Sequence, residues 1–66
     1  MARWTASAVV AYYANRYGLE KGLLWSFMDN LFGIRRGDRI RIDAADQDEF
    51  AAVVLDYVAN RKGATA

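Results

Sequence analysis

The stretch that decides the fold is residues 14–42, ANRYGLEKGLLWSFMDNLFGIRRGDRIRI. Its first half predicts two helices joined by a short turn at Gly18, because glycine takes the positive φ of a helix end without a steric cost. A small residue, Ala14, lies four positions before this glycine, where the two helices of a helix-turn-helix come closest. The apolar Tyr17 and Leu19 flank the turn. The segment therefore has the spacing of a helix-turn-helix.

The second half of the stretch predicts a β-hairpin. Residues 34–42 alternate between apolar and basic side chains, and residues 36–38 have the composition of a hairpin turn. The alternation directs Ile40 and Ile42 toward the core and the basic side chains outward. Because a two-stranded hairpin is only marginally stable alone, we expect it to pack against the helices. The basic residues of this segment are Arg35, Arg36, Arg39 and Arg41.

Three helices are predicted in all: the two that meet at Gly18 and one that follows the hairpin. Residues 6–17 have apolar side chains at helical spacing, and Thr5 before them is a suitable N-cap. The second helix covers about residues 20–32. A third helix begins after Asp43 or Asp46, both of which are good N-caps. Its predicted core-facing residues are Phe50, Val53, Val54, Tyr57 and Val58. The fold class is thus mainly α with a small β-hairpin: helix-turn-helix, hairpin wing and C-terminal helix.

Length and composition limit the possible functions. The 66 residues form one domain, 1–66, with an ordered core of about 5–62. The chain has no cysteine and no histidine, which excludes disulfides, a thiol nucleophile, the usual zinc ligands and the commonest general base. We therefore expect no enzyme, no catalytic residue, no metal, no cofactor and no small-molecule substrate.

The hydropathy pattern predicts a cytoplasmic protein without membrane contact. The N-terminal apolar run is too short for a signal peptide and no cleavage pattern follows it. The longest apolar region, residues 19–34, is interrupted by charged and amide side chains and is too short and too polar to span a bilayer.

The arginines are concentrated although the net charge is only +1. A compact basic patch on a nearly neutral domain fits local contact with phosphates. Acidic residues follow the patch directly, so an alternative is a solvated hairpin whose arginines pair with those acids. On the second helix, the polar stripe offers only Lys21 as a good reader of base edges, and Asp29 would repel phosphate.

Residues 31–54, LFGIRRGDRIRIDAADQDEFAAVV, resemble the end of the excisionase and MerR-like winged-helix domains of bacteria and their phages. In that family a β-wing of the form basic-Gly-Arg-apolar-Arg-Ile leads into an acidic-capped helix with an apolar residue soon after. The matching residues here are Gly37, Arg39, Ile40, Arg41, Ile42, Asp46 and Phe50. The chain departs from the family in two respects: its second helix lacks the polar recognition face, and its loop before the wing is shorter. The resemblance implies DNA bending or architectural binding beside a recombinase, or repression at a short operator.

Two functions follow as expectations. The first is a small DNA-binding protein of the phage or plasmid excisionase or repressor type, a transcription regulator that binds double-stranded DNA. Its predicted DNA-binding residues are Lys21, Trp25, Ser26, Arg35, Arg36, Arg39 and Arg41. The alternative is a protein–protein interaction module, an adaptor, inhibitor or self-associating subunit. That module would use the apolar second helix, and its predicted contact residues are Leu23, Trp25, Met28 and Leu55.

Overall fold

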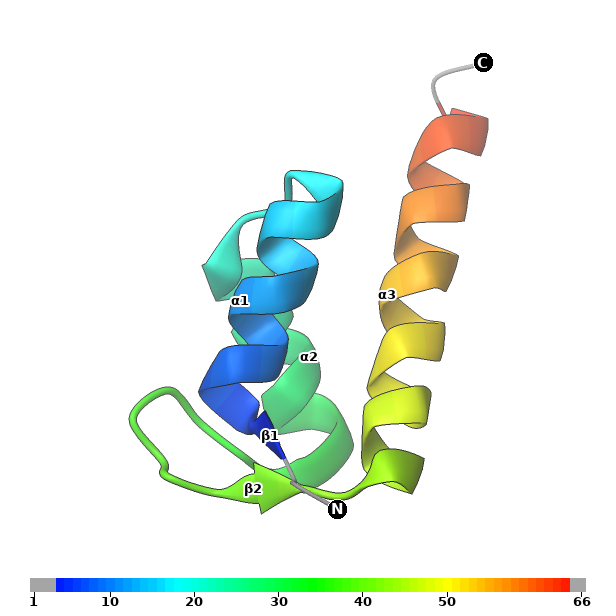
Figure 1. Ribbon diagram of the computed structural model, residues 1–66. Helices are drawn as coiled ribbons and strands as arrows, with labels where there is room; N and C mark the ends of the chain where they lie inside the picture. The colour runs from blue at the N-terminus through cyan, green and yellow to red at the C-terminus, as the bar shows by residue number, and fades with distance from the viewer. Residues whose placement is uncertain (1–3, 65–66) are drawn as a thin grey trace.

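The computed structural model describes residues 4–64, which form three helices and one small antiparallel sheet (Figure 1). The elements in chain order are β1 (Trp4–Thr5), α1 (Ala6–Tyr17), α2 (Lys21–Phe32), β2 (Arg41–Ile42) and α3 (Ala44–Ala64). Helices α1 and α2 pack on each other, and α3 runs alongside α1 and extends past its end. The predicted mainly helical fold with one small antiparallel β element is confirmed.

Helix α1 begins and ends where the sequence predicts. The Thr5 side chain accepts a hydrogen bond from the Ala8 N–H over 3.1 Å, which satisfies one of the free donors of the first turn. At the other end Gly18 has φ 65° and ψ 37°, the left-handed conformation that closes a helix. The Leu19 N–H donates to the Ala14 carbonyl over 3.0 Å. Ala14 itself is buried, as a residue at a close approach of two helices must be.

Helix α2 follows after a short turn. Glu20 is its N-cap residue but makes no capping hydrogen bond with its side chain. Gly33 ends the helix with φ 69°, and its N–H donates to the Asp29 carbonyl over 2.8 Å. Gly18 and Gly33, both in the left-handed conformation, therefore let the chain turn before α2 and after it.

The predicted β-hairpin within residues 34–42 is wrong in its pairing. Strand β2 pairs with β1 at the start of the chain, with Trp4 opposite Ile42 and Thr5 opposite Arg41. One further hydrogen bond, from the Ala6 N–H to the Ile40 carbonyl over 2.9 Å, extends this contact into the loop. The antiparallel pair is thus long-range rather than a local hairpin.

A local turn accounts for the difference. The Asp38 carboxylate accepts from the Arg35 N–H over 2.9 Å, and the Asp38 N–H donates back to the Arg35 carbonyl over 3.0 Å. Both backbone groups of Arg35 are therefore used inside the turn and are not available to a β ladder. Residues 33–40 consequently form a loop, in which Gly37 has φ 97°.

The predicted inward position of Ile40 is also wrong. Ile42 is 2% exposed, as expected, but Ile40 is 44% exposed. Regular alternation of side chains requires extended strand geometry, and β2 contains only residues 41–42. Ile34, which is buried, contributes to the core from the beginning of the same loop.

Helix α3 begins after Asp43. The Asp43 carboxylate accepts from the Asp46 N–H over 2.9 Å, so Asp43 is the N-cap and Asp46 lies in the first turn. The buried side chains that hold the helices together are Val10, Leu24, Met28, Phe50 and Val54. Leu55 is exposed, as its position off the apolar stripe predicts. No described helix has the length and apolar character needed to cross a bilayer.

Candidate nucleic-acid interface

The loop of residues 33–40 lies against the start of α1 and the middle of α2 (Figure 1). A shallow hollow forms where the three segments meet. Its lining residues are Thr5, Ser7, Trp25, Arg36, Gly37, Asp38, Arg39 and Arg41. Three of the four predicted wing arginines therefore line one surface, although Arg36 and Arg39 are carried by a loop and Arg41 by β2 instead of by a local hairpin.

A second shallow hollow adjoins the first along α2. Its lining residues are Gly22, Trp25, Ser26, Asp29, Arg35 and Arg36. The two hollows share Trp25 and Arg36, so they form one continuous surface. The predicted DNA-binding residues that the structure brings together on it are Trp25, Ser26, Arg35, Arg36, Arg39 and Arg41. This set is called the arginine surface below.

Lys21 does not line either hollow. It is exposed in the first turn of α2, four residues before Trp25. Residues four apart lie on the same face of a helix. Lys21 is therefore placed on the side of α2 that leads into the arginine surface, without being part of it.

The side chains of Arg35, Arg36 and Arg39 are largely available to a ligand. Arg35 makes one long ion pair, with 3.9 Å between its Nε and Oδ1 of Asp29, and its side chain remains 81% exposed. Such an exposed pair contributes little to stability, so phosphate can compete for the guanidinium. Arg36 and Arg39 are exposed and make no ion pair with any side chain in residues 4–61. The alternative in which these two arginines pair with the acids that follow them is not what the structure shows.

Trp25 and Ser26 contribute in a more limited way. Trp25 is partly buried and packs against the core, which fixes its indole in the wall shared by the two hollows. The Ser26 hydroxyl donates to the Gly22 carbonyl over 3.1 Å. Because its proton is engaged, Ser26 offers a ligand only acceptor lone pairs. Direct contact from Ser26 to a phosphate oxygen is therefore unfavourable in this rotamer.

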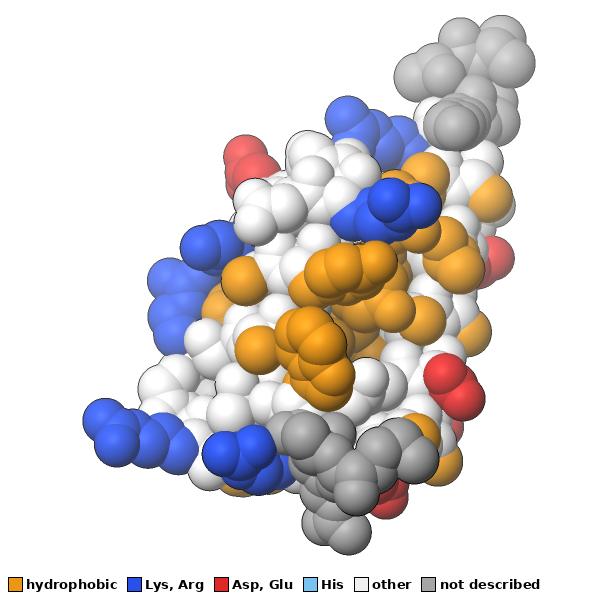
Figure 2. Space-filling view, in the orientation of Figure 1, with side chains coloured by type: hydrophobic (Ala, Val, Ile, Leu, Met, Phe, Trp, Pro, Cys, Tyr) orange, Lys and Arg blue, Asp and Glu red, His pale blue; other side chains and the backbone are white. Residues whose placement is uncertain are grey.

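The charged side chains are only partly separated on the face that Figure 2 draws. Figure 2 shows Lys and Arg side chains along the left and lower edges of this face and also near its top and upper middle; acidic side chains lie mostly along the α3 edge, with one at the upper left, and hydrophobic ones gather in the middle. Sequence reasoning missed Thr5 and Ser7 in the first hollow, because only the long-range pairing of β1 with β2 brings them to the loop.

Comparisons with protein-family models, with curated proteins and with solved structures found no match.

Proposed function

We propose that this protein is a small DNA-binding protein of winged-helix type that binds duplex DNA through the arginine surface. The observation that carries the proposal is the convergence of four arginines and Trp25 from the loop, β2 and α2 on two adjoining hollows. Exposed guanidinium groups suit phosphate oxygens, which accept paired hydrogen bonds from arginine. In this arrangement the loop takes the place of the wing, and α2 faces a groove.

The chemistry of the surface favours backbone contact over base reading. Arginines on a loop contact phosphates or enter a minor groove, while base reading in the major groove requires polar side chains on the helix. On α2 the only long polar side chain facing this way is Lys21, and Asp29 lies at the edge of the second hollow. We therefore propose weak sequence preference and an architectural or repressor role in the cytoplasm.

The alternative of a partner-binding apolar α2 has less support. Met28, one of its predicted contact residues, is 0% exposed, and Leu24 beside it is also completely buried. These side chains are already used in the core of the single chain. Leu55 is 48% exposed and lies on α3.

The proposal is tested by measuring duplex affinity over a range of salt concentrations. If Arg39 contacts a phosphate, Arg39→Ala lowers affinity for all duplex sequences about equally and reduces the slope of log affinity against log salt by about 0.9. Arg16→Ala is the matched control, because Arg16 is exposed on α1 and lies over the Tyr17 ring, outside both hollows. An unchanged slope for Arg39→Ala, or an equal change for both variants, would refute the proposed interface.

A further inference from the structure

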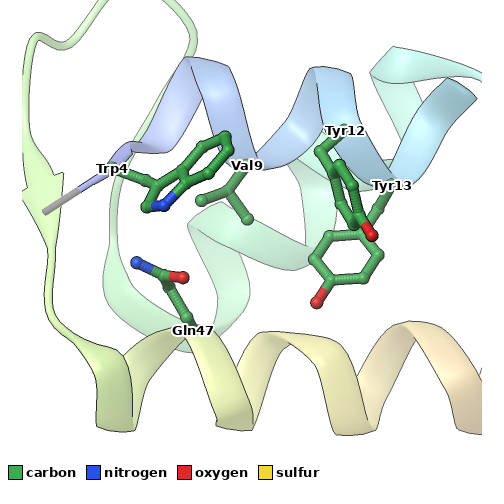
Figure 3. A pocket seen from close by; sticks show the side chains of 5 residues that line it. All are labelled: Trp4, Val9, Tyr12, Tyr13 and Gln47. Atoms are coloured by element: carbon green, nitrogen blue, oxygen red, sulfur yellow. The ribbon is translucent and has the colours of Figure 1, made fainter. Parts of the chain in front are cut away.

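A separate hollow, outside the arginine surface, lies between α1 and the first turns of α3 (Figure 3). It has a volume of about 130 Å³, and its lining residues are Trp4, Val9, Tyr12, Tyr13 and Gln47. We call it the aromatic hollow. Val9 is buried, whereas Trp4 and Tyr12 are half exposed. Because it shares no lining residue with the arginine surface, the proposed DNA contact does not account for it.

The three aromatic rings are set at steep angles to one another. The Trp4 and Tyr12 ring centroids are 6.4 Å apart with planes inclined at 62°, and those of Tyr12 and Tyr13 are 5.0 Å apart at 85°. These edge-to-face contacts hold the Tyr12 ring at a steep angle to both of its neighbours. Tyr13 is held in place from behind, since its ring lies 5.8 Å from that of the buried Phe50. The hollow therefore exists before any ligand binds.

Gln47 completes the hollow from α3 with an oriented amide. Its Nε2 donates to the Ile42 carbonyl over 3.5 Å, and Figure 3 shows its oxygen on the opposite side, toward the hollow. An amide oxygen with a free lone pair is an acceptor and carries partial negative charge. The polar group that α3 contributes to the hollow is therefore an electron-rich oxygen.

The charges around the aromatic hollow favour a cation. Among the described side chains, no lysine or arginine lines it. Asp48 follows Gln47 on α3, and its carboxylate lies near enough to Tyr13 to add to the effects of burial, Tyr12 and Tyr17, which together raise the pKa of the Tyr13 hydroxyl. Aromatic faces attract cations through the ring quadrupole, and tryptophan does so most strongly. Ring faces, amide oxygen and nearby carboxylate all act in the same direction.

We propose that the aromatic hollow binds an alkylated ammonium group of the kind found in choline. The volume suits a single head group and is well below that of a site for a drug-sized molecule, which is typically about 300 Å³ or more. A bare metal ion is a poor fit, because hard cations require several oxygen ligands and Gln47 supplies one. An alkylated ammonium combines positive charge with an apolar shell, which suits a hollow lined by three aromatic side chains and Val9.

Choline chloride is the probe, and the indole N–H resonances of the two tryptophans in NMR spectra are the readout. Binding is expected to shift the Trp4 resonance and to leave that of Trp25, on the arginine surface, unchanged. The neutral isostere of choline, with carbon in place of nitrogen, has the same shape without the charge. We expect choline to bind at least about threefold more tightly than this isostere. Equal affinities would show that the hollow takes apolar groups in general, and an unshifted Trp4 resonance would show that it is not a site; either result overturns the proposal.

Variants at Tyr12 test whether its aromatic ring contributes to choline binding beyond the shape that it gives the hollow. Tyr12 is 49% exposed, so both Tyr12→Phe and Tyr12→Leu should fold, which circular dichroism checks. Tyr12→Phe keeps the π face and is expected to bind choline like the parent chain. Tyr12→Leu keeps apolar bulk without the face and is expected to lose at least half of the affinity. If the two variants bind equally well, the rings do not recognise the cation and the proposal fails. Neither change is expected to alter the salt slope of DNA binding, so the two proposals are tested independently.

Discussion

Replacing Gly18 with alanine tests the turn between α1 and α2 most directly. Gly18 has φ 65° and ψ 37°, and a Cβ added there would meet no atom within 4 Å. The substitution therefore introduces no clash with neighbouring side chains, and its cost is the backbone strain of a non-glycine residue in the left-handed region, about 1–2 kcal/mol. For a domain of this size, each kcal/mol lowers the midpoint of thermal unfolding by roughly 4–8 °C. Gly18→Val adds a β-branched side chain at the same φ and is expected to cost more, up to about 3 kcal/mol.

Gly22→Ala is the matched control. Gly22 is exposed in the first turn of α2, has no positive φ, and would also place its Cβ in open space. Alanine there restricts the unfolded chain and improves helix propensity, so it is expected to stabilise by up to about 1 kcal/mol. The same chemical change is thus predicted to have opposite signs at two positions four residues apart. Thermal and urea unfolding followed by circular dichroism measure both variants. If Gly18→Ala melts at or above the parent temperature, the left-handed turn is misplaced and the reasoning fails.

Two further predictions concern α3 and Tyr13. Asp43→Ala removes the carboxylate that accepts from the Asp46 N–H, and it is expected to lower the free energy of unfolding in urea by about 1 kcal/mol. Asp43→Asn keeps a good N-cap and should lower it much less. Equal losses would show that the cap is not the cause. Burial, followed by the effects of Tyr12, Tyr17 and Asp48, raises the pKa of Tyr13 above its ordinary value of 10.0. Above about pH 10 the unfolded chain therefore loses this proton more readily than the folded chain, and stability falls as the pH rises through the raised pKa. Tyr13→Phe should reduce this alkaline fall in urea midpoints, and an unchanged fall would assign it to another group.

The helices could be predicted because their signals are local. Thr5, Gly18 and Gly33 each act within one turn of their own position, through a side-chain cap or a positive φ, and the structure has α1 and α2 ending at these residues. Asp43 and Asp46 illustrate the limit of such signals. Both residues have side chains that can cap a helix. Asp43 is the cap in the structure because β2 ends at Ile42, directly before it.

The sheet could not be predicted because its partner is distant in sequence. Strand β1 has two residues and no alternation of its own, so nothing in the sequence near Trp4 points to Ile42. The alternating run before Ile42 predicted a local hairpin, but the Asp38 carboxylate satisfies the Arg35 backbone in a turn instead. The arginines are nevertheless clustered as predicted, because the turn itself brings Arg36 and Arg39 together. Thr5 and Ser7 could be found only once the long-range pairing was known.

The pairing of β1 with β2 has a consequence for how the molecule opens. The loop of residues 33–40 is attached to the core by buried Ile34 at one end and by buried Ile42 at the other, with the two-residue ladder and the Ala6–Ile40 hydrogen bond beside it. Breaking those few bonds would free the middle of the loop while Ile34 and Ile42 stay buried in the core with Leu24, Met28 and Phe50. Regions with few buried contacts open at lower free energy than the global transition. The loop that carries Arg35, Arg36 and Arg39 is therefore expected to open in a subglobal step, at a lower free energy than the unfolding of the helices, whereas Trp25 and Ser26 on α2 stay in place.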